Sequence, residues 1–173
     1  MNSERFTVVG FYTPEYEDCV VQFVSVAENL NLSVVVERME SRWDWTANTR
    51  LKPGALLQLR QKVQGILLYL DIDTLLLRVP RIPEQPWDVA VADNPVKTHV
   101  NRLTAGAFFL ADTDAARLFL MEWHRLCMLG GGKDHNHFST AVMNPMAYRV
   151  ARADFAGCMK VNGLRPEREQ AIS

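Results

Sequence analysis

Short apolar runs alternate with amphipathic stretches in the amino-terminal part of the chain. Residues 6–11 and 33–36 are rich in β-branched and aromatic side chains, which predicts two buried strands. Residues 16–30 predict a helix between them, because apolar positions recur there at three- and four-residue intervals: Val20, Phe23, Val24, Ala27 and Leu30. A strand, a helix and a strand at this spacing predict a βαβ unit with parallel strands.

An irregular stretch, a helix and a continuous apolar run follow. Residues 41–50 are polar and aromatic without a clear period, so we expect a loop on the ligand side of the fold. Its tryptophans, Trp43 and Trp45, are candidates either to stack on a nucleotide base or to pack on the core. Residues 52–63 predict a helix with a proline in its first turn, where proline is tolerated. Residues 66–70 predict a buried strand.

Prolines separate this first part from the second half of the chain. Residues 78–87 contain Pro80, Pro83 and Pro86, a spacing that predicts an irregular connector across the sheet edge. Beyond it, the pattern predicts strands over residues 88–92, 105–110 and 148–151, and helices over residues 112–129 and 134–142.

These elements together predict an α/β fold: a single Rossmann-like domain with a mostly parallel central sheet flanked by helices. We expect residues 1–163 to form this domain and residues 164–173 to be a polar, frayed tail.

Composition narrows the class of partner and compartment. A formal net charge of −1 and a pI near 6.4 argue against a nucleic-acid partner, which would require a broad basic surface. The cysteines, Cys19, Cys127 and Cys158, are odd in number and widely spaced, so neither a disulfide framework nor a zinc knuckle is expected, and a reducing, cytoplasmic location is the simplest. The chain contains no apolar stretch of the length that a transmembrane segment requires.

Two carboxylates follow the apolar run of residues 66–70. In an extended Asp-x-Asp, Asp71 and Asp73 direct their side chains to the same side of the strand. The carboxyl edge of an open α/β sheet is where ligands bind, and paired carboxylates suit Mg²⁺ or Mn²⁺ with coordination positions left for phosphate oxygens. The arrangement predicts a divalent cation and a nucleotide-diphosphate ligand.

The order of these landmarks resembles the nucleotide-sugar glycosyltransferases of the GT-A type over roughly residues 6–143, most of a typical domain. The residues that carry the resemblance are Phe11 to Thr13, Tyr16, the stretch from Trp43 to Pro53 with Asn48 and Thr49, Leu68 to Thr74 followed by Pro80, Asn101 to Leu110, and Trp123.

For the metal and the diphosphate, the resemblance implies three residues. Asp73 would ligate Mn²⁺ or Mg²⁺, and Asp71 would contact the ribose or the metal. Lys52, at the start of the helix before this strand, would help to hold the diphosphate or the sugar.

For the rest of the donor, the resemblance implies contacts at both ends of the nucleotide sugar. Thr13 and Tyr16 would lie near the nucleoside. The segment from Asn101 to Gly106 would approach the donor sugar, with Gly106 allowing the backbone to come close.

Glycosyl transfer also needs a leaving diphosphate whose charge is offset, and an acceptor hydroxyl that loses a proton. Asp134 is the first candidate for the base and Asp93 the second, since both lie on segments that should reach the same sheet edge. Asp134 stands where such enzymes often carry an Asp-Gln pair, with His135 in place of the glutamine. The expected activity is a metal-dependent glycosyltransferase of hexosyltransferase type, acting on a saccharide, lipid or protein acceptor.

Two other functions remain open. The chain is short for a full transferase, so it is also a candidate for a non-catalytic or reduced sugar-nucleotide-binding protein of the same fold. A phosphatase of the haloacid-dehalogenase type also has Asp-x-Asp after an apolar strand, but its motif places one residue between the second Asp and the Thr. Here Thr74 follows Asp73 directly.

Overall fold

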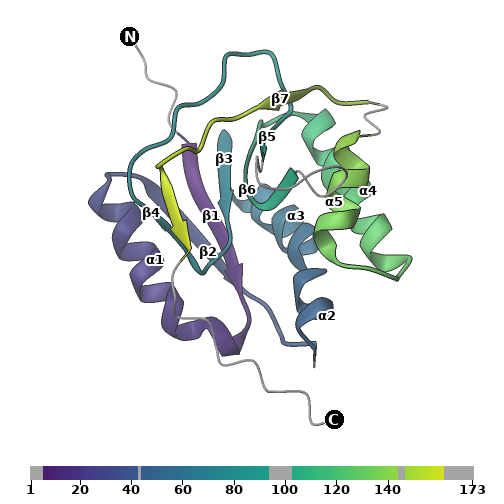
Figure 1. Cartoon of the computed structure of the whole chain (residues 1–173), viewed down its shortest axis with the longest axis horizontal. Helices are drawn as coiled ribbons and strands as arrows, with labels where there is room; N and C mark the ends of the chain where they lie inside the picture. The colour runs from purple at the N-terminus through teal and green to yellow at the C-terminus, as the bar shows by residue number, and fades with distance from the viewer. Residues whose placement is uncertain (1–5, 43, 94–102, 144–146, 162–173) are drawn as a thin grey trace.

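A mixed six-stranded sheet forms the centre of the part of the chain described by the computed structural model, residues 6–42, 44–93, 103–143 and 147–161 (Figure 1). The strand order is β2-β1-β3-β6-β5-β7. Its strands are β1 (Phe6–Tyr12), β2 (Ser33–Arg38), β3 (Ile66–Leu70), β5 (Val89–Asp93), β6 (Leu103–Leu110) and β7 (Val150–Arg152).

The directions of the strands determine which edge of the sheet can bind a ligand. The pairs β1·β2, β1·β3 and β5·β7 are parallel, while β6 runs antiparallel to both β3 and β5. The carboxyl ends of β1, β3 and β5 therefore meet at one edge, together with the start of β6. The prediction of an α/β fold with a mostly parallel sheet is confirmed.

Helices cover both faces of this sheet. They are α1 (Glu17–Asn29), α2 (Trp45–Thr49), α3 (Lys52–Lys62), α4 (Asp114–Met128) and α5 (Asp134–Met143), with a 3-10 turn, η1 (Pro14–Tyr16), before α1. In Figure 1, α1 lies on one side of the sheet, and α3, α4 and α5 lie on the other.

The alternation of side chains along β3 divides the core in two. Leu68 and Leu70 face α1, where they pack with residues such as Phe23. Leu67 and Tyr69 face the opposite layer and pack with the buried side chains of α3, α4 and α5. Side chains on one face of a strand are two residues apart. Asp71 therefore follows Leu67 and Tyr69 on the face covered by α3, at the carboxyl edge of the sheet.

The structure corrects one predicted loop and adds two strands. Residues 41–50 contain a short helix, α2, because Asp44 Oδ1 accepts a hydrogen bond from the Ala47 amide at 2.9 Å and caps it. β4 (Thr74–Leu76) and β8 (Met159–Val161), which the pattern did not predict, pair antiparallel as a separate two-stranded ribbon. The proline-rich connector of residues 78–87 contains no helix or strand, as expected.

All three cysteines lie within the described residues. Cys19, Cys127 and Cys158 are buried and form no disulfide. None of the helices in the described ranges combines the length and the apolar character that crossing a membrane requires.

Candidate functional site

A cavity of about 470 Å³ opens at the carboxyl edge of the sheet. It collects side chains from β1 and η1, from α2 and α3, from the turn after β3, from β6 and from β8. Its lining residues are Phe11, Tyr12, Thr13, Tyr16, Trp45, Asn48, Thr49, Lys52, Tyr69, Asp71, Ile72, Asp73, Thr74, Thr104, Gly106, Ala107, Met159 and Lys160.

The Asp-x-Asp segment forms the turn between β3 and β4. The Asp71 amide donates a hydrogen bond to the Gly106 carbonyl at 2.9 Å, which anchors the turn to β6. The Thr74 amide donates to the Asp71 carbonyl at 2.8 Å and closes it. Both carboxylate residues, Asp71 and Asp73, line the cavity, but they do so from a turn and not from the extended strand end that the sequence predicts.

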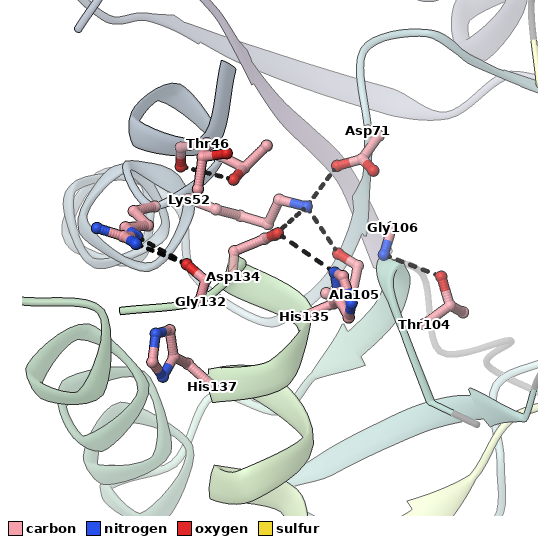
Figure 2. A network of polar contacts seen from close by, with 12 residues as sticks. Thr46, Lys52, Asp71, Thr104, Ala105, Gly106, Gly132, Asp134, His135 and His137 are labelled. Carbon is pink, nitrogen blue, oxygen red and sulfur yellow. Dashed lines mark hydrogen bonds and ion pairs between the residues drawn. The ribbon is translucent and has the colours of Figure 1, made fainter. Parts of the chain in front are cut away.

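Lys52 lies at the floor of the cavity and is only 5% exposed. Its Nζ lies 2.8 Å from Asp71 Oδ1 and 3.0 Å from Asp134 Oδ2 (Figure 2). It also donates to the Ala105 carbonyl at 3.1 Å. A lysine ammonium has three N–H donors, so these acceptors use all of them. Lys52 thus lines the cavity but has its N–H donors directed at acceptors of the protein itself.

Charge and burial act in opposite directions on this cluster. Burial alone lowers the pKa of Lys52, but the Asp134 and Asp71 carboxylates more than offset this and raise its pKa above the ordinary value of a lysine. Burial, followed by the Asp71 charge, raises the pKa of Tyr69 well above its usual range. Tyr69 Oη consequently stays protonated and donates to Asp71 Oδ1 at 2.7 Å.

Gly106 lies against the second oxygen of Asp71. A Cβ at this position would stand 2.8 Å from Asp71 Oδ2, closer than a carbon and an oxygen can approach without one of them moving. Its amide donates to Thr104 Oγ1 at 3.2 Å, which holds the β6 backbone in place (Figure 2). Close packing against Asp71 thus explains why position 106 is a glycine, in addition to the donor-sugar role implied by the resemblance.

Asp134 contacts Lys52 from the start of α5. It is the first residue of α5, it is 4% exposed, and it does not line the cavity. Its carbonyl accepts a hydrogen bond from Trp123 Nε1 at 3.1 Å, which fixes the start of α5 to α4. His135 Nδ1 lies 3.9 Å from Asp134 Oδ1 (Figure 2). The structure thus brings Asp134 to Lys52 rather than to the open cavity.

The other predicted site residues divide into three groups. Thr13, directly after β1, and Tyr16, the last residue of η1, line the cavity. Asp93 is the last residue of β5, which ends at the same sheet edge. Asn101 lies outside the described residues.

Trp45 forms part of the wall on the α2 side. Its side chain is 46% exposed, and the Lys133 ammonium lies 5.5 Å from its ring centroid, a cation–π contact. Trp45 therefore lines the cavity instead of packing in the core, and its stacking on a nucleotide base stays a prediction. Trp43 lies outside the described residues.

The site's carboxylates suit a hard divalent cation with few protein ligands. Within the described ranges, no group of three or more His, Cys, Asp and Glu side chains is placed to hold a metal ion. Asp71 Oδ1 is occupied by Lys52 and Tyr69, which leaves Asp71 Oδ2 and the Asp73 carboxylate as candidate ligands. Mg²⁺ is commonly bound by one or two carboxylates together with substrate phosphates and water, so this donor set fits the expected cation.

Sequence reasoning missed Tyr69 and Lys160. Tyr69 is a tyrosine in an otherwise aliphatic strand, and its position two residues before Asp71 places both on one face. Lys160 belongs to a strand of three residues that has no detectable period.

Searches of the sequence against protein-family models and curated proteins give no match. Solved structures do match. A glycosyltransferase involved in the glycosylation of the major capsid of PBCV-1 superposes with a TM-score of 0.66 at 12% identity, covering 87% of this chain and 82% of that one.

The glycosyltransferase GlyE of Streptococcus pneumoniae TIGR4 gives a TM-score of 0.61 at 10% identity, and its apo form gives 0.58 at 12% identity. These matches cover 87% and 84% of this chain but 46% and 44% of GlyE, so the chain spans less than half of that enzyme's length. The chain has the fold of these glycosyltransferase structures, and the resemblance seen in the sequence is confirmed at that level.

Proposed function

We propose that the protein is a metal-dependent glycosyltransferase, of hexosyltransferase type, that binds a nucleotide-diphosphate sugar in the cavity at the carboxyl edge of the sheet. One observation carries the proposal. Asp71 and Asp73 open into the same cavity as Thr13 and Tyr16, in a chain with the fold of known glycosyltransferases. The nucleoside would lie by Thr13 and Tyr16, and the diphosphate would lie by the two carboxylates.

Asp73 and Asp71 Oδ2 would hold Mn²⁺ or Mg²⁺ together with oxygens of the diphosphate. A divalent cation bound there offsets the negative charge that develops on the departing nucleoside diphosphate. The chain's own contribution is to hold the Asp71 carboxylate in position. Tyr69 and Lys52 hold one of its oxygens, and the absence of a side chain at Gly106 leaves space at the other.

In this proposal, Lys52 and Asp134 hold Asp71 in position. Because Lys52 uses its donors on Asp71, Asp134 and the Ala105 carbonyl, it orients Asp71 instead of binding the diphosphate. Asp134 balances the buried ammonium, and this ion pair favours a positioning role for Asp134 over that of a base. Asp93 remains the other candidate base, on a strand that ends at the same edge.

Turnover of nucleotide sugars tests the activity. The purified protein with Mn²⁺ is incubated with UDP-glucose, UDP-galactose, UDP-N-acetylglucosamine and GDP-mannose, and the released nucleoside diphosphate is measured with and without simple saccharide acceptors. We expect release from at least one donor, because water can take the place of the acceptor hydroxyl when no acceptor is present. Asp73→Ala should abolish it.

Two other outcomes would select the alternatives. Binding of a nucleotide sugar without any turnover would indicate a sugar-nucleotide-binding protein. Release of phosphate from p-nitrophenyl phosphate, without activity on nucleotide sugars, would indicate a phosphatase and overturn the proposal.

Asp134→Asn separates the two roles of Asp134. A positioning residue should change donor affinity and turnover together, since Asp71 loses its fixed partner. A general base should lower kcat alone and leave donor affinity unchanged.

A further inference from the structure

One exposed face of α4 is largely apolar. Leu118, Met121 and Met128 are 48%, 56% and 73% exposed, while the opposite face packs into the core through residues such as Phe119. Together with Arg125, these side chains recur at intervals of three and four residues, so they lie along one side of the helix and form the α4 stripe. Scattered exposed apolar residues are ordinary, but a helix on the surface of a domain normally turns polar residues toward water. The α4 stripe therefore indicates a surface that a partner covers.

The charged side chains on this side of α4 are of both signs. The Arg125 guanidinium, within the stripe, donates to the two carboxylate oxygens of Glu122 at 2.7 and 2.8 Å. Near the start of the helix, Arg117 pairs with Asp114 at 2.7 Å. The charges of these four side chains cancel. Binding to an anionic membrane surface requires an excess of Lys and Arg, so the pattern favours a partner that itself carries both signs.

A second copy of this chain is complementary to the α4 stripe when the two α4 helices lie antiparallel. With a two-fold axis midway along the stripe, Leu118 of one copy lies opposite Met128 of the other, because both are equally far from the axis. Met121 then lies against the alkyl part of the partner's Arg125, and Glu122 lies beside the guanidinium of that arginine. Antiparallel packing also brings together helix ends of opposite partial charge. The stripe thus pairs apolar with apolar side chains and carboxylate with guanidinium.

We propose that the α4 stripe is the contact of a symmetric homodimer in which the α4 helices of two copies pack antiparallel. A standard protein interface takes about 800 Å² from each partner, and four side chains on one helix offer less. The dimer is therefore weak, with a dissociation constant of about 1–100 μM, and it dissociates on dilution. This inference concerns a different surface from the cavity and does not depend on the proposed function.

Sedimentation velocity of the full chain, over concentrations that bracket this constant, tests the proposal. The variants are Leu118→Glu and Met128→Lys, each measured alone and then mixed in equal amounts. Val21→Glu is the matched control, because Val21 is an apolar residue 77% exposed on α1, on the other side of the sheet (Figure 1). Thermal melting followed by circular dichroism shows that each variant is folded.

We expect the wild type and Val21→Glu to dimerise equally as concentration rises. Leu118→Glu or Met128→Lys alone should weaken the dimer about tenfold or more, because each places a charge against an apolar side chain of the partner at both ends of the contact. In the mixture, the introduced carboxylate lies opposite the introduced ammonium at one end, and the other end keeps the native contact. The mixture should therefore form heterodimers at a concentration at which each variant alone is a monomer.

A wild type that stays monomeric over the whole range would overturn the inference. A dimer that both stripe variants leave unchanged, or that Val21→Glu weakens as much as they do, would also overturn it, since its contact then lies elsewhere. Monomeric variants whose mixture stays monomeric would exclude the antiparallel arrangement. Assemblies larger than a dimer would contradict it as well, because a two-fold contact closes on itself.

Discussion

Lys52 joins three separate parts of the chain at one atom. Its Nζ contacts Asp71 after β3, Asp134 at the start of α5 and the Ala105 carbonyl in β6. Lys52 and Asp134 are buried, so their charges are screened little by water. Removing one charged member of a buried ion pair leaves the opposite charge without a partner. This costs more folding free energy than replacing both members by apolar residues.

Lys52→Met should therefore destabilise the protein by about 3–5 kcal/mol, as expected when one member of a buried ion pair is deleted. Urea denaturation at neutral pH measures this loss. Lys62→Met, at the exposed end of the same helix, is the control and should change stability little.

The double variant Lys52→Met with Asp134→Leu should recover part of the loss, because the unpaired buried carboxylate is then removed too. A double variant no more stable than Lys52→Met would contradict the account of the cluster.

Gly106→Ala tests the close approach of β6 to Asp71. The added Cβ would stand 2.8 Å from Asp71 Oδ2, while Oδ1 is held by Lys52 and Tyr69, so the carboxylate has little freedom to move away. We expect a destabilisation of about 1–3 kcal/mol, typical of overpacking, together with weaker nucleotide binding. Gly65→Ala is the control for replacing a glycine without a clash at the site. A Cβ at Gly65 has no neighbouring atom, although the backbone there has a positive φ.

The sequence indicated Asp71, Asp73, Lys52 and Asp134 as candidate site residues but could not give their contacts. The two aspartates follow an apolar run, which local pattern alone detects. The pairing of Lys52 with Asp134 depends on how α4 packs against both α3 and α5, and residues so far apart along the chain have no local signal. A lysine at a helix start is more often a surface charge, so burial of Lys52 was not predictable.

At the scale of elements, the Asp88 carboxylate connects β5, α4 and β7. Its carboxylate accepts hydrogen bonds from Thr113, the N-cap residue of α4, at 2.8 Å and from the Arg149 backbone amide, just before β7, at 2.8 Å. The Arg149 guanidinium adds contacts of 3.0 and 3.1 Å. The start of β5, the start of α4 and the edge strand β7 thus meet at one carboxylate.

This contact predicts a pH dependence of stability. Hydrogen bonds from the Arg149 side chain, partly opposed by burial, lower the pKa of Asp88 to about 2. A depressed folded-state pKa stabilises the protein above the unfolded value and loses that contribution as pH falls through the folded one. Asp88→Asn should therefore cost about 2 kcal/mol near pH 7, the free energy equivalent of the pKa difference.

Urea denaturation of the wild type and Asp88→Asn at several pH values between 7 and 3 checks this. The difference in unfolding free energy should narrow below about pH 4, the usual pKa of an aspartate. Asp18→Asn, at an exposed position of α1, should show no such trend. A difference that stays constant with pH would contradict the role of the Asp88 charge.

Most elements were predicted because their periodicity is strong. The helical spacing of α1 and the continuous apolar run of β3 carry their own signal. β4 and β8 have three residues each, and they form only because they meet across a long separation in the chain. α2 has five residues, fewer than two turns, so its apolar positions cannot show a period.

At the scale of the whole molecule, the topology decides where chemistry is possible. The carboxyl ends of β1, β3 and β5 share one edge, and the ribbon of β4 and β8 adds a wall there. The mixed sheet places the start of β6 between β3 and β5, which brings Gly106 against Asp71. The site therefore depends on the order of the strands as much as on the residues themselves.

The central claim is that this edge binds a nucleoside diphosphate through Asp73. The most direct measurement is calorimetry of UDP and GDP binding, with and without Mn²⁺, to the wild type and to Asp73→Asn. We expect at least one diphosphate to bind the wild type more tightly with Mn²⁺, and Asp73→Asn to lose that metal-dependent gain while its melting temperature stays near that of the wild type. Equal binding by both proteins, or no binding by the folded wild type, would contradict the account.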